Sequence, residues 1–425
     1  TALSYGKGLE VRPFSLTRKY QDPGTDPQAA GREVRAASIV TGQYTLEGEQ
    51  LQVTLEAIDV EGNSLIWRHR LSVGADDPLA LRDEVASTVR RDLLPALGGR
   101  TEAEVVPAAP TNAEAYQLYL ESLAIARDPE PNLRAIELLE QVVELDPEFA
   151  GGWAALAARY SFLGYYGGRP VDERFVIFGK AERAARRALE LDPNNLEAAR
   201  ELMFRAIEEG RTGEAYEIAK EILARNPDGA QAHFMMSYVY RYVGLLKDAA
   251  RECDLALALS PSDFRLRSCA ITFYRLGDFD RSRDFLALDP GSRWARSHEG
   301  SLLYFSGDLE GSQNSLLRAC LDDPESEETR QMLEGAVTLA ETGPDPEQRY
   351  HILALFAACG LVDEALRLLP VVAEVGYCAP NVFDEGPFRS LEGQPGWEEV
   401  QAAHNSCQAV FLEAKARVDS GQPLG

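Results

Sequence analysis

The sequence predicts a mainly α-helical protein, in which a small N-terminal α/β domain precedes an array of helix pairs and a C-terminal capping helix. Three observations support this fold class. Prolines that close apolar runs recur at a nearly constant spacing, glycines fall between them, and the first hundred residues show the two-residue alternation of strands. The repeats cover more than half of the chain, so they determine the predicted architecture.

The array is recognised by the prolines that end successive helix pairs. They are Pro193, Pro227, Pro261, Pro290 and Pro324. Three of the four spacings are 34 residues and one is 29. A helix–turn–helix unit of this size cannot bury its own apolar face, so neighbouring units must stack. Because a helix end often needs the left-handed conformation, glycines mark the turns within the pairs, namely Gly210, Gly244, Gly277 and Gly307.

A second motif strengthens this interpretation. Trp153, Leu156, Ala157 and Tyr160 match the spacing W-x-x-L-G-x-x-Y, with Ala in place of Gly. The motif and the period resemble the tetratricopeptide repeat family over residues 112–369. The resemblance implies an α-solenoid in which the first helix of each pair lines a concave groove. A bundle of unrelated helices is the alternative.

Two irregular spacings predict local departures from the repeat. The step of 46 residues from Pro147 to Pro193 predicts an insertion near 164–170, which extends a loop or a helix end. The step of 29 residues predicts a shortened second helix near 279–288. After Pro324 the period weakens, and we expect one helix over 327–341 and a last pair over 347–359 and 361–374.

Residues 1–97 are predicted to form the α/β domain. Three strands are expected over 37–46, 51–60 and 65–73, joined by short glycine-containing turns into an antiparallel meander. A shorter strand is expected at 9–14. Asp26-Pro27 and Asp77-Pro78 are typical helix starts, so a helix should follow each of them.

The remaining boundaries follow from composition. Residues 98–111 contain Gly and Pro and are predicted to be a linker, and residues 112–374 are the repeat array. Residues 375–425 are predicted to be a loop followed by a capping helix from Pro395 to about Ala416. Its apolar residues Trp397, Val400, Val410 and Phe411 are expected to cover the last repeat.

The order of motifs in the first domain resembles a TolB-type N-terminal domain. It is carried by Asp26-Pro27-Gln28, Ile39-Val40-Thr41-Gly42 and Ile66-Trp67, in that order. In bacterial adenylate cyclases, winged-helix regulators and receptor-type Ser/Thr kinases such a domain directly precedes a tetratricopeptide array. The tail motif around Tyr377-Cys378-Ala379-Pro380 is similar to the same chains. The resemblance implies the regulatory, extracytoplasmic region of a larger membrane protein, with a cytoplasmic location as the alternative.

The start of the chain departs from that family. The usual first strand, and most of the helix after it, are expected to precede Thr1, so the chain is expected to be a fragment or a processed product. A missing strand leaves a sheet edge that can pair with another chain.

Composition excludes several function classes. The net charge is −25, whereas nucleic acids and anionic membranes both need a cationic surface. No apolar run approaches the ~20 residues that span a bilayer. No phosphate-binding loop, nucleophile elbow or metal-spaced His pair occurs, so we expect no catalytic residues, no metal site and no cofactor.

The candidate binding site is the concave groove. Counting from each proline, eleven side chains are expected to face it, and arginine and aromatic residues dominate the set. They are Arg200, Phe204, Phe234, Tyr238, Arg241, Tyr242, Arg265, Thr272, Arg275, Trp294 and Tyr304. Because arginine forks onto carboxylates and aromatic faces bind side chains, the set predicts a site for a protein or peptide segment. The alternative is that these residues pack between helices and that the arginines pair with neighbouring acids.

All six cysteines lie in the second half of the chain. Cys253 and Cys320 are expected to be buried free thiols. Cys359 or Cys407 can bridge to Cys378 if the chain is extracytoplasmic, although no pairing follows from the sequence.

Three functional hypotheses remain. The first is a non-enzymatic sensory or scaffolding module that binds protein ligands. The second is an assembly protein whose groove or open sheet edge binds another copy of the same chain. The third, an enzyme, is the least favoured because no catalytic signature occurs.

Overall fold

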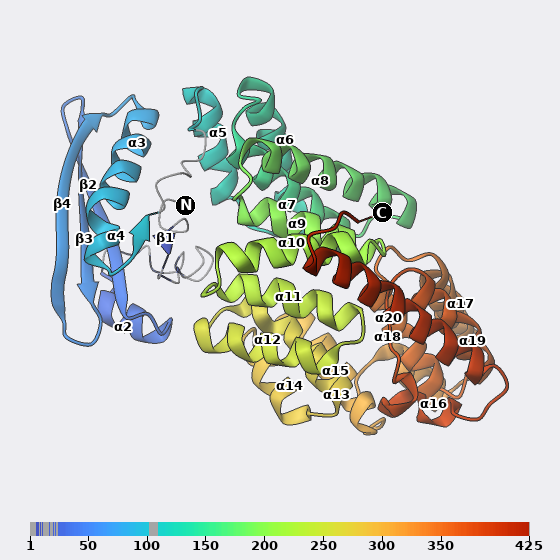
Figure 1. Ribbon diagram of the computed structural model, residues 1–425. Coiled ribbons are helices and arrows are strands. Elements are labelled where there is room, and N and C mark those ends of the chain that lie inside the picture. The colour runs from blue at the N-terminus through green and yellow to red at the C-terminus, as the bar shows by residue number, and fades with distance from the viewer. Residues whose placement is uncertain are drawn as a thin grey trace.

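A computed structural model describes residues 24–101 and 109–424, and residues 6, 7, 9, 11, 17, 20 and 22 before them. Figure 1 shows a three-stranded sheet on one side and a curved array of helices on the other. Helix α3 (Pro78–Thr88) lies between the sheet and the array, where it packs on β4 (Ser64–Gly74) and on α5 (Ala113–Ala124). The mainly helical fold class with a small leading sheet is confirmed.

The sheet is the predicted antiparallel meander. Strands β2 (Ser38–Glu47), β3 (Gln50–Asp59) and β4 pair in this order, so β2 and β4 are the edges. Val53 lies opposite Tyr44 on one side and Leu71 on the other. Ala57 and Leu71 are buried, as the alternating pattern requires.

Both predicted helices of this region form where an aspartate caps them. Asp26 caps α2 (Pro27–Glu33), and the Asp77 carboxylate accepts a hydrogen bond of 2.8 Å from the Ala80 amide at the start of α3. Helix α3 continues through a π-helical turn, Val89–Leu93, into α4 (Leu94–Ala96). The strand predicted at 9–14 lies outside the described residues, except for Leu9 and Val11. A short ladder between β1 (Gly6–Lys7) and β5 (Arg100–Thr101) was not expected.

Six helix pairs follow, each joined by a short connection. They are α5 with α6 (Pro129–Leu145), α7 (Ala150–Tyr166) with α8 (Val171–Leu191), α9 (Leu196–Glu208) with α10 (Thr212–Arg225), α11 (Ala230–Tyr242) with α12 (Leu246–Leu259), α13 (Cys269–Leu276) with α14 (Phe279–Leu286), and α15 (Arg293–Ser306) with α16 (Ser315–Asp322). From α7 onward the first helices pack on one another in sequence, so they form one continuous face. Repeating pairs with this contact pattern are a tetratricopeptide-type solenoid.

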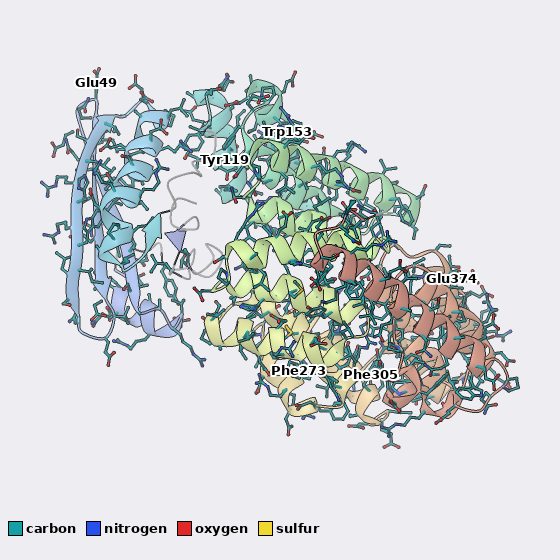
Figure 2. All side chains as sticks on the ribbon, in the orientation of Figure 1. Glu49, Tyr119, Trp153, Phe273, Phe305 and Glu374 are labelled. Atoms are coloured by element: carbon teal, nitrogen blue, oxygen red, sulfur yellow. A yellow bond between two sulfur atoms is a disulfide. The ribbon has the colours of Figure 1, made fainter. Side chains whose placement is uncertain are left out.

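The two irregular spacings have structural counterparts. The inserted residues lengthen the second pair itself, because α7 has 17 residues and α8 has 21. The short step corresponds to α13 and α14 of 8 residues each, with a 3-10 helix, Phe264–Ser268, before α13. Figure 2 shows side chains throughout the array, with Tyr119 and Trp153 in the first two pairs and Phe273 and Phe305 in later ones.

The C-terminal region turns back onto the middle of the array. It comprises α17 (Glu327–Thr342), α18 (Pro346–Ala358), α19 (Val362–Glu374), two short 3-10 helices, Val382–Asp384 and Gly386–Leu391, and α20 (Trp397–Asp419). Helix α20 packs on α19, as predicted for a capping helix, and also on α10 (Figure 1). The Tyr216 hydroxyl donates a hydrogen bond of 3.0 Å to Asp419 at this second contact.

One detail of the predicted capping helix is wrong. Phe411 is fully buried against the Tyr216 ring, but Val410 is 65% exposed. Adjacent side chains of a helix point about 100° apart, and here Val410 points to solvent while Phe411 points into the core.

The cysteines form three disulfides: Cys253–Cys269, Cys320–Cys359 and Cys378–Cys407. The expectation of free thiols at Cys253 and Cys320 is therefore wrong, because helix stacking brings each within bonding distance of a cysteine 16 or 39 residues away. The pairing of Cys378 with Cys407 was one of the two bridges considered. It ties the loop after α19 to α20.

Candidate functional site

The eleven residues that we predicted to line the concave groove divide into two groups by burial. Six are buried: Phe234, Arg241, Tyr242, Thr272, Arg275 and Tyr304. Five are partly exposed: Arg200, Phe204, Tyr238, Arg265 and Trp294. The buried group comes from α11, α13 and α15. The partly exposed group comes from α9, α11, the 3-10 helix before α13 and the start of α15.

Arg241 of α11 pairs with the start of α18. Its Nε and Nη2 atoms donate to the two carboxylate oxygens of Glu347 at 2.8 and 3.0 Å, and its Nη1 donates to the Ser268 carbonyl at 3.0 Å. The Tyr238 ring lies 4.3 Å from the guanidinium carbon. Burial lowers the pKa of Arg241, but the Glu347 carboxylate outweighs that effect, so the pKa stays above its ordinary value.

Arg275 of α13 makes the same kind of pair with the loop that follows α19. Its Nη2 and Nε atoms donate to the Glu385 carboxylate at distances from 2.9 to 3.2 Å, and its Nη1 donates to the Tyr377 hydroxyl at 2.8 Å. Tyr377 in turn donates to Glu347 at 3.0 Å, so the two ion pairs form one network. Burial raises the pKa of Glu385, while Arg275 opposes the rise.

The loop 376–391 is seated on the turns between the repeat helices. The Cys378 amide donates to the Tyr242 carbonyl at 2.7 Å. Gly244 has a φ of 74°, and a Cβ added there would lie 2.8 Å from the Cys378 carbonyl oxygen. The turn glycine therefore serves the left-handed turn and also leaves room for the loop.

One apolar core joins this region to the array. It runs without a break from α9 to α20 and includes Tyr350 and Phe388, whose rings lie 5.0 Å apart. The face from α11 to α15 is thus filled by the chain's own α18 and loop 376–391, and we call this part the filled half. The six candidate residues of the filled half contact other parts of this chain. Their predicted binding of a peptide stays a prediction.

Arg200, Phe204 and Tyr238 remain partly exposed next to the filled half, and we call these three residues the open strip. The Phe204 and Tyr238 rings are 4.6 Å apart, and the Arg200 guanidinium lies 5.9 Å from the Phe204 ring centre. Arg200 donates through Nη2 to Glu201 at 2.7 Å, whereas its Nε has no partner among the described residues.

A buried polar cluster around Glu208 lies next to the open strip. The Glu208 carboxylate accepts from Tyr165 at 2.5 Å and from Arg205, and the Tyr238 hydroxyl lies 3.4 Å from it. The Arg205 guanidinium lies 3.9 Å from the Phe178 ring centre. These buried contacts hold α7, α8, α9 and α11 together, so the strip lies on a rigid base.

The other two partly exposed candidates are engaged locally. Arg265 donates to the carboxylate of Asp263, with Nη2 at 2.7 Å. Trp294 lies between the Arg267 guanidinium, 4.9 Å from its ring centre, and the His298 ring at 4.0 Å. Neither residue therefore belongs to the open strip.

A pair of histidines, His298 and His351, lies at the rim of the filled half. The Tyr274 hydroxyl is 3.3 Å from Nδ1 of His298 on α15 and 2.9 Å from Nε2 of His351 on α18. Burial lowers the pKa of each histidine to about 3, and the neighbouring His351 adds to the shift at His298. Both rings are therefore neutral at neutral pH.

Sequence reasoning missed the residues that complete the network, which are Glu347, Tyr377 and Glu385. They lie about a hundred residues after their arginine partners, and nothing local marks them as inward-facing. The one available signal was that Glu385 stands in an apolar stretch, between Val382-Phe383 and Phe388. A carboxylate in such a stretch is a candidate for a buried, paired charge.

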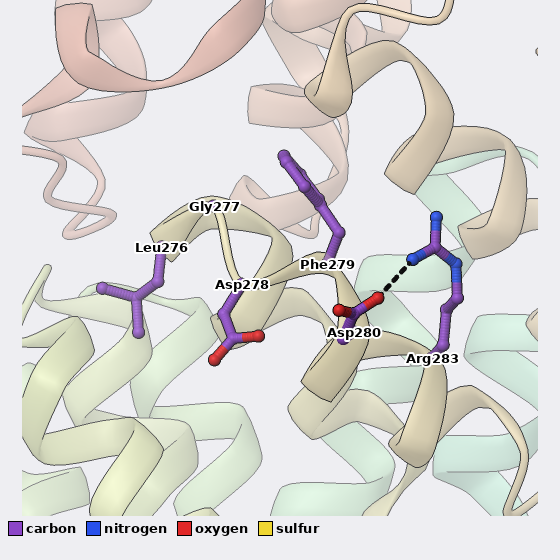
Figure 3. A pocket seen from close by; sticks show the side chains of 6 residues that line it. All are labelled: Leu276, Gly277, Asp278, Phe279, Asp280 and Arg283. Carbon is purple, nitrogen blue, oxygen red and sulfur yellow. Dashed lines mark hydrogen bonds and ion pairs between the residues drawn. The ribbon is translucent and has the colours of Figure 1, made fainter.

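The surface depression in Figure 3 lies where α13 meets α14 and is lined by Leu276, Asp278, Phe279, Asp280 and Arg283. Its ion pair, Arg283 with Asp280 at 2.9 Å, is solvated, because the Asp280 side chain is 99% exposed. The described residues contain no cluster of three metal-ligating side chains, and none of the described helices is long and apolar enough to cross a membrane.

Comparison with known proteins gives matches to parts of the chain. A family model for the second domain of HilA/YgeH-like transcriptional regulators matches residues 1–88, and the TolB-type resemblance stays a prediction. A putative adenylate cyclase 3 from Rhizobium meliloti (strain 1021) is 24% identical over 188 residues. The aligned region covers 43% of this chain and 32% of that protein, so this chain matches about a third of its relative.

Several solved structures align with about half of this chain or less, with low TM-scores. PilW, a type IV pilus biogenesis factor, aligns with 52% of this chain and 100% of its own at 16% identity and a TM-score of 0.38. Pseudomonas aeruginosa pilF aligns with 52% of this chain and 96% of its own at 18% identity and a TM-score of 0.34. MamA from Desulfovibrio magneticus RS-1 aligns with 41% of this chain and 93% of its own at 15% identity and a TM-score of 0.31. The assignment of the array as tetratricopeptide repeats therefore rests on its own period and helix pairing.

Proposed function

We propose that the chain is a non-enzymatic protein-interaction module of a bacterial signalling protein. It binds a segment of a partner protein along the open strip. The supporting observation is that Arg200, Phe204 and Tyr238 are partly exposed on a rigid base, beside a half of the same face that is already filled. Repeat solenoids commonly use their concave surface for binding.

The filled half supports the chemical class of the ligand. There, arginines of the array fork onto carboxylates of an incoming segment, and aromatic rings of the two sides pack edge to face. Arg200 and Phe204 offer the same two groups to a segment from outside. A partner segment with a carboxylate next to an aromatic or aliphatic side chain suits this strip.

The signalling context is supported by the kind of proteins that match. One is a putative adenylate cyclase and the other a family of transcriptional regulators. An extracytoplasmic location is supported by the three disulfides, because such bonds persist mainly in oxidising compartments. A cytoplasmic location is the alternative.

The proposal is tested with peptides selected against the purified chain from a phage-displayed library, followed by fluorescence polarisation. We expect Arg200→Glu and Phe204→Ala each to weaken binding of the selected peptides by about tenfold or more, the effect of losing about 1.4 kcal/mol. Arg318→Glu is the matched control, because Arg318 lies on α16 and pairs only with Asp322 in the described contacts. Equal losses in all three variants would exclude the open strip as the site.

Self-assembly is the second candidate function. The observation that favours it is the outer edge of β2, which pairs with no strand of the described residues.

A further inference from the structure

The outer edge of β2 has the features of a strand that can accept another strand. It is ten residues long, and its ladder with β3 runs from Ser38 to Glu47 without a bulge. It carries no Pro, and Glu47 at its end is its only charged residue. An unpaired edge of this length and composition is a template for strand addition.

The opposite edge of the same sheet is protected. Strand β4 carries three consecutive basic side chains at Arg68, His69 and Arg70, and its register with β3 is broken by an irregularity at Ala57/Ile58. Charged residues and bulges are the usual means by which an edge strand avoids pairing. Strand β2, by contrast, has an unbroken ladder with β3 and a single charged residue, Glu47, at its end.

Apolar side chains on β2 add to the open backbone edge. Val40, Tyr44 and Leu46 are 39%, 75% and 63% exposed. Their register places them on the face of the sheet that carries the buried Ala57 and Leu71, which is the face that α3 covers over β4. The apolar face therefore continues past α3 to the β2 edge, where the described residues leave it uncovered.

We propose that β2 binds the β2 strand of a second copy of this chain, in an antiparallel pair centred on Gln43. In this register Val40 lies opposite Leu46, and Tyr44 lies opposite Gly42. An aromatic ring that covers a glycine on the neighbouring strand is a favourable cross-strand pair. The two three-stranded sheets then form one continuous sheet across a two-fold axis.

Charge is the reason to choose a second copy as the occupant. The only charged residue of the strand, Glu47, lies opposite Ile39 of the partner in this register, so no like charges face each other. On the polar face Thr41 lies opposite Thr45. The strand is thus complementary to itself on both faces.

The interface is expected to be weak on its own. One strand pair and three apolar side chains per copy bury less than the ~1,200 Å² of a stable interface. Each copy also carries a net charge of −25, so the copies repel at low salt. We therefore expect a dimer that forms with rising protein concentration and is favoured by salt, which screens the repulsion.

Sedimentation equilibrium of the full chain at two salt concentrations tests the proposal. The expected result is a monomer–dimer equilibrium that Tyr44→Lys weakens at least tenfold. Leu65→Lys is the matched control, because Leu65 is a similarly exposed apolar residue (51%) at the β4 edge, and it should leave the equilibrium unchanged. A monomer at all concentrations, or a dimer that Tyr44→Lys does not affect, would overturn the proposal.

Disulfide cross-linking tests the register independently of affinity. Gln43→Cys places two thiols opposite each other across the two-fold axis, so mild oxidation should give a covalent dimer. Thr41→Cys is the control, because Thr41 faces Thr45 and its own copy lies about four residues, or roughly 13 Å, away along the strand. Cross-linking of the Thr41 variant but not of the Gln43 variant would contradict the register.

Discussion

The two halves of the concave face use the same residue types in different ways. In the filled half Arg241 and Arg275 have no exposed side-chain surface, and each is matched by a carboxylate more than a hundred residues away. In the open strip Arg200 keeps 17% of its side chain exposed, and its one ion-pair partner among the described residues is its neighbour Glu201. The two groups of arginines therefore differ in burial and in partner rather than in residue type, and on this difference we base the proposal that Arg200 is available to a ligand.

The largest expected difference between the halves concerns the ion pairs. Glu385→Ala leaves Arg275 buried without its partner, so we expect a loss of about 3–5 kcal/mol in the free energy of unfolding. Arg200→Ala in the open strip should cost less than Glu385→Ala but more than the ~1 kcal/mol of a surface pair, because Arg200 is 17% exposed while its partner Glu201 is only 7% exposed. Denaturant titration of both variants measures the two values. Equal losses of unfolding free energy would contradict the idea that the ion pair of the filled half stabilises the fold more than that of the open strip.

The disulfide between Cys378 and Cys407 allows the filling segment to be loosened selectively. Replacing both cysteines by serine should cost about 2–4 kcal/mol. It should also speed tryptic cleavage after Arg389, which is exposed in loop 376–391. The variant with Cys253 and Cys269 replaced is the control, since that bridge joins α12 to the start of α13. If cleavage after Arg389 rises equally in both, the loop is not held by its own disulfide.

The smallest expected effect is a pH dependence of opposite sign at two histidines. The pKa of His351 is lowered by burial to about 3, whereas unfolded histidine titrates near 6.5. The stability that depends on its neutral ring is therefore complete above about pH 6.5 and is lost as the pH falls toward 3. The pKa of His233 is raised, chiefly by its hydrogen bond to Glu252, so its contribution is complete below about pH 6.5 and is lost as the pH rises through the raised pKa.

Unfolding free energies at about pH 5.5 and 7.5 distinguish the two histidines. When the pH falls from about 7.5 to about 5.5, protonation of His351 should lower the unfolding free energy of the wild-type chain. Protonation of His233 should raise it and so offset part of that loss. His351→Gln should reduce the loss, and His233→Gln should increase it. The same change in both variants would show that the pKa shifts do not determine this pH dependence.

The sequence predicted the local structure of the chain well, because its signals are local. The prolines that recur along the array each follow the end of a second helix. The turn at Gly277 has the left-handed conformation, with a φ of 78°. The strands of the meander begin and end within one or two residues of their predicted bounds, because alternation and turn residues mark them.

The candidate site was predicted less completely. Counting from the prolines identified helix positions that do face inward, as the burial of Tyr242, Thr272 and Tyr304 shows. It could not show what each position faces. A helix position specifies the direction of a side chain, whereas its partner depends on how the whole solenoid curves.

The sequence by itself determined the helix pairs, their period, the shortened unit near Phe279 and the three-stranded meander. Each of these depends on residues close together in the chain, whose spacing matches one turn geometry or one periodicity. Only the tertiary structure decided that loop 376–391 returns to the array, that Glu347 and Glu385 pair with Arg241 and Arg275, and which cysteines join. These contacts span up to 110 residues, and many alternative partners have the same chemistry. The packing of the solenoid selects among them, because it brings only one set of partners together in a buried space.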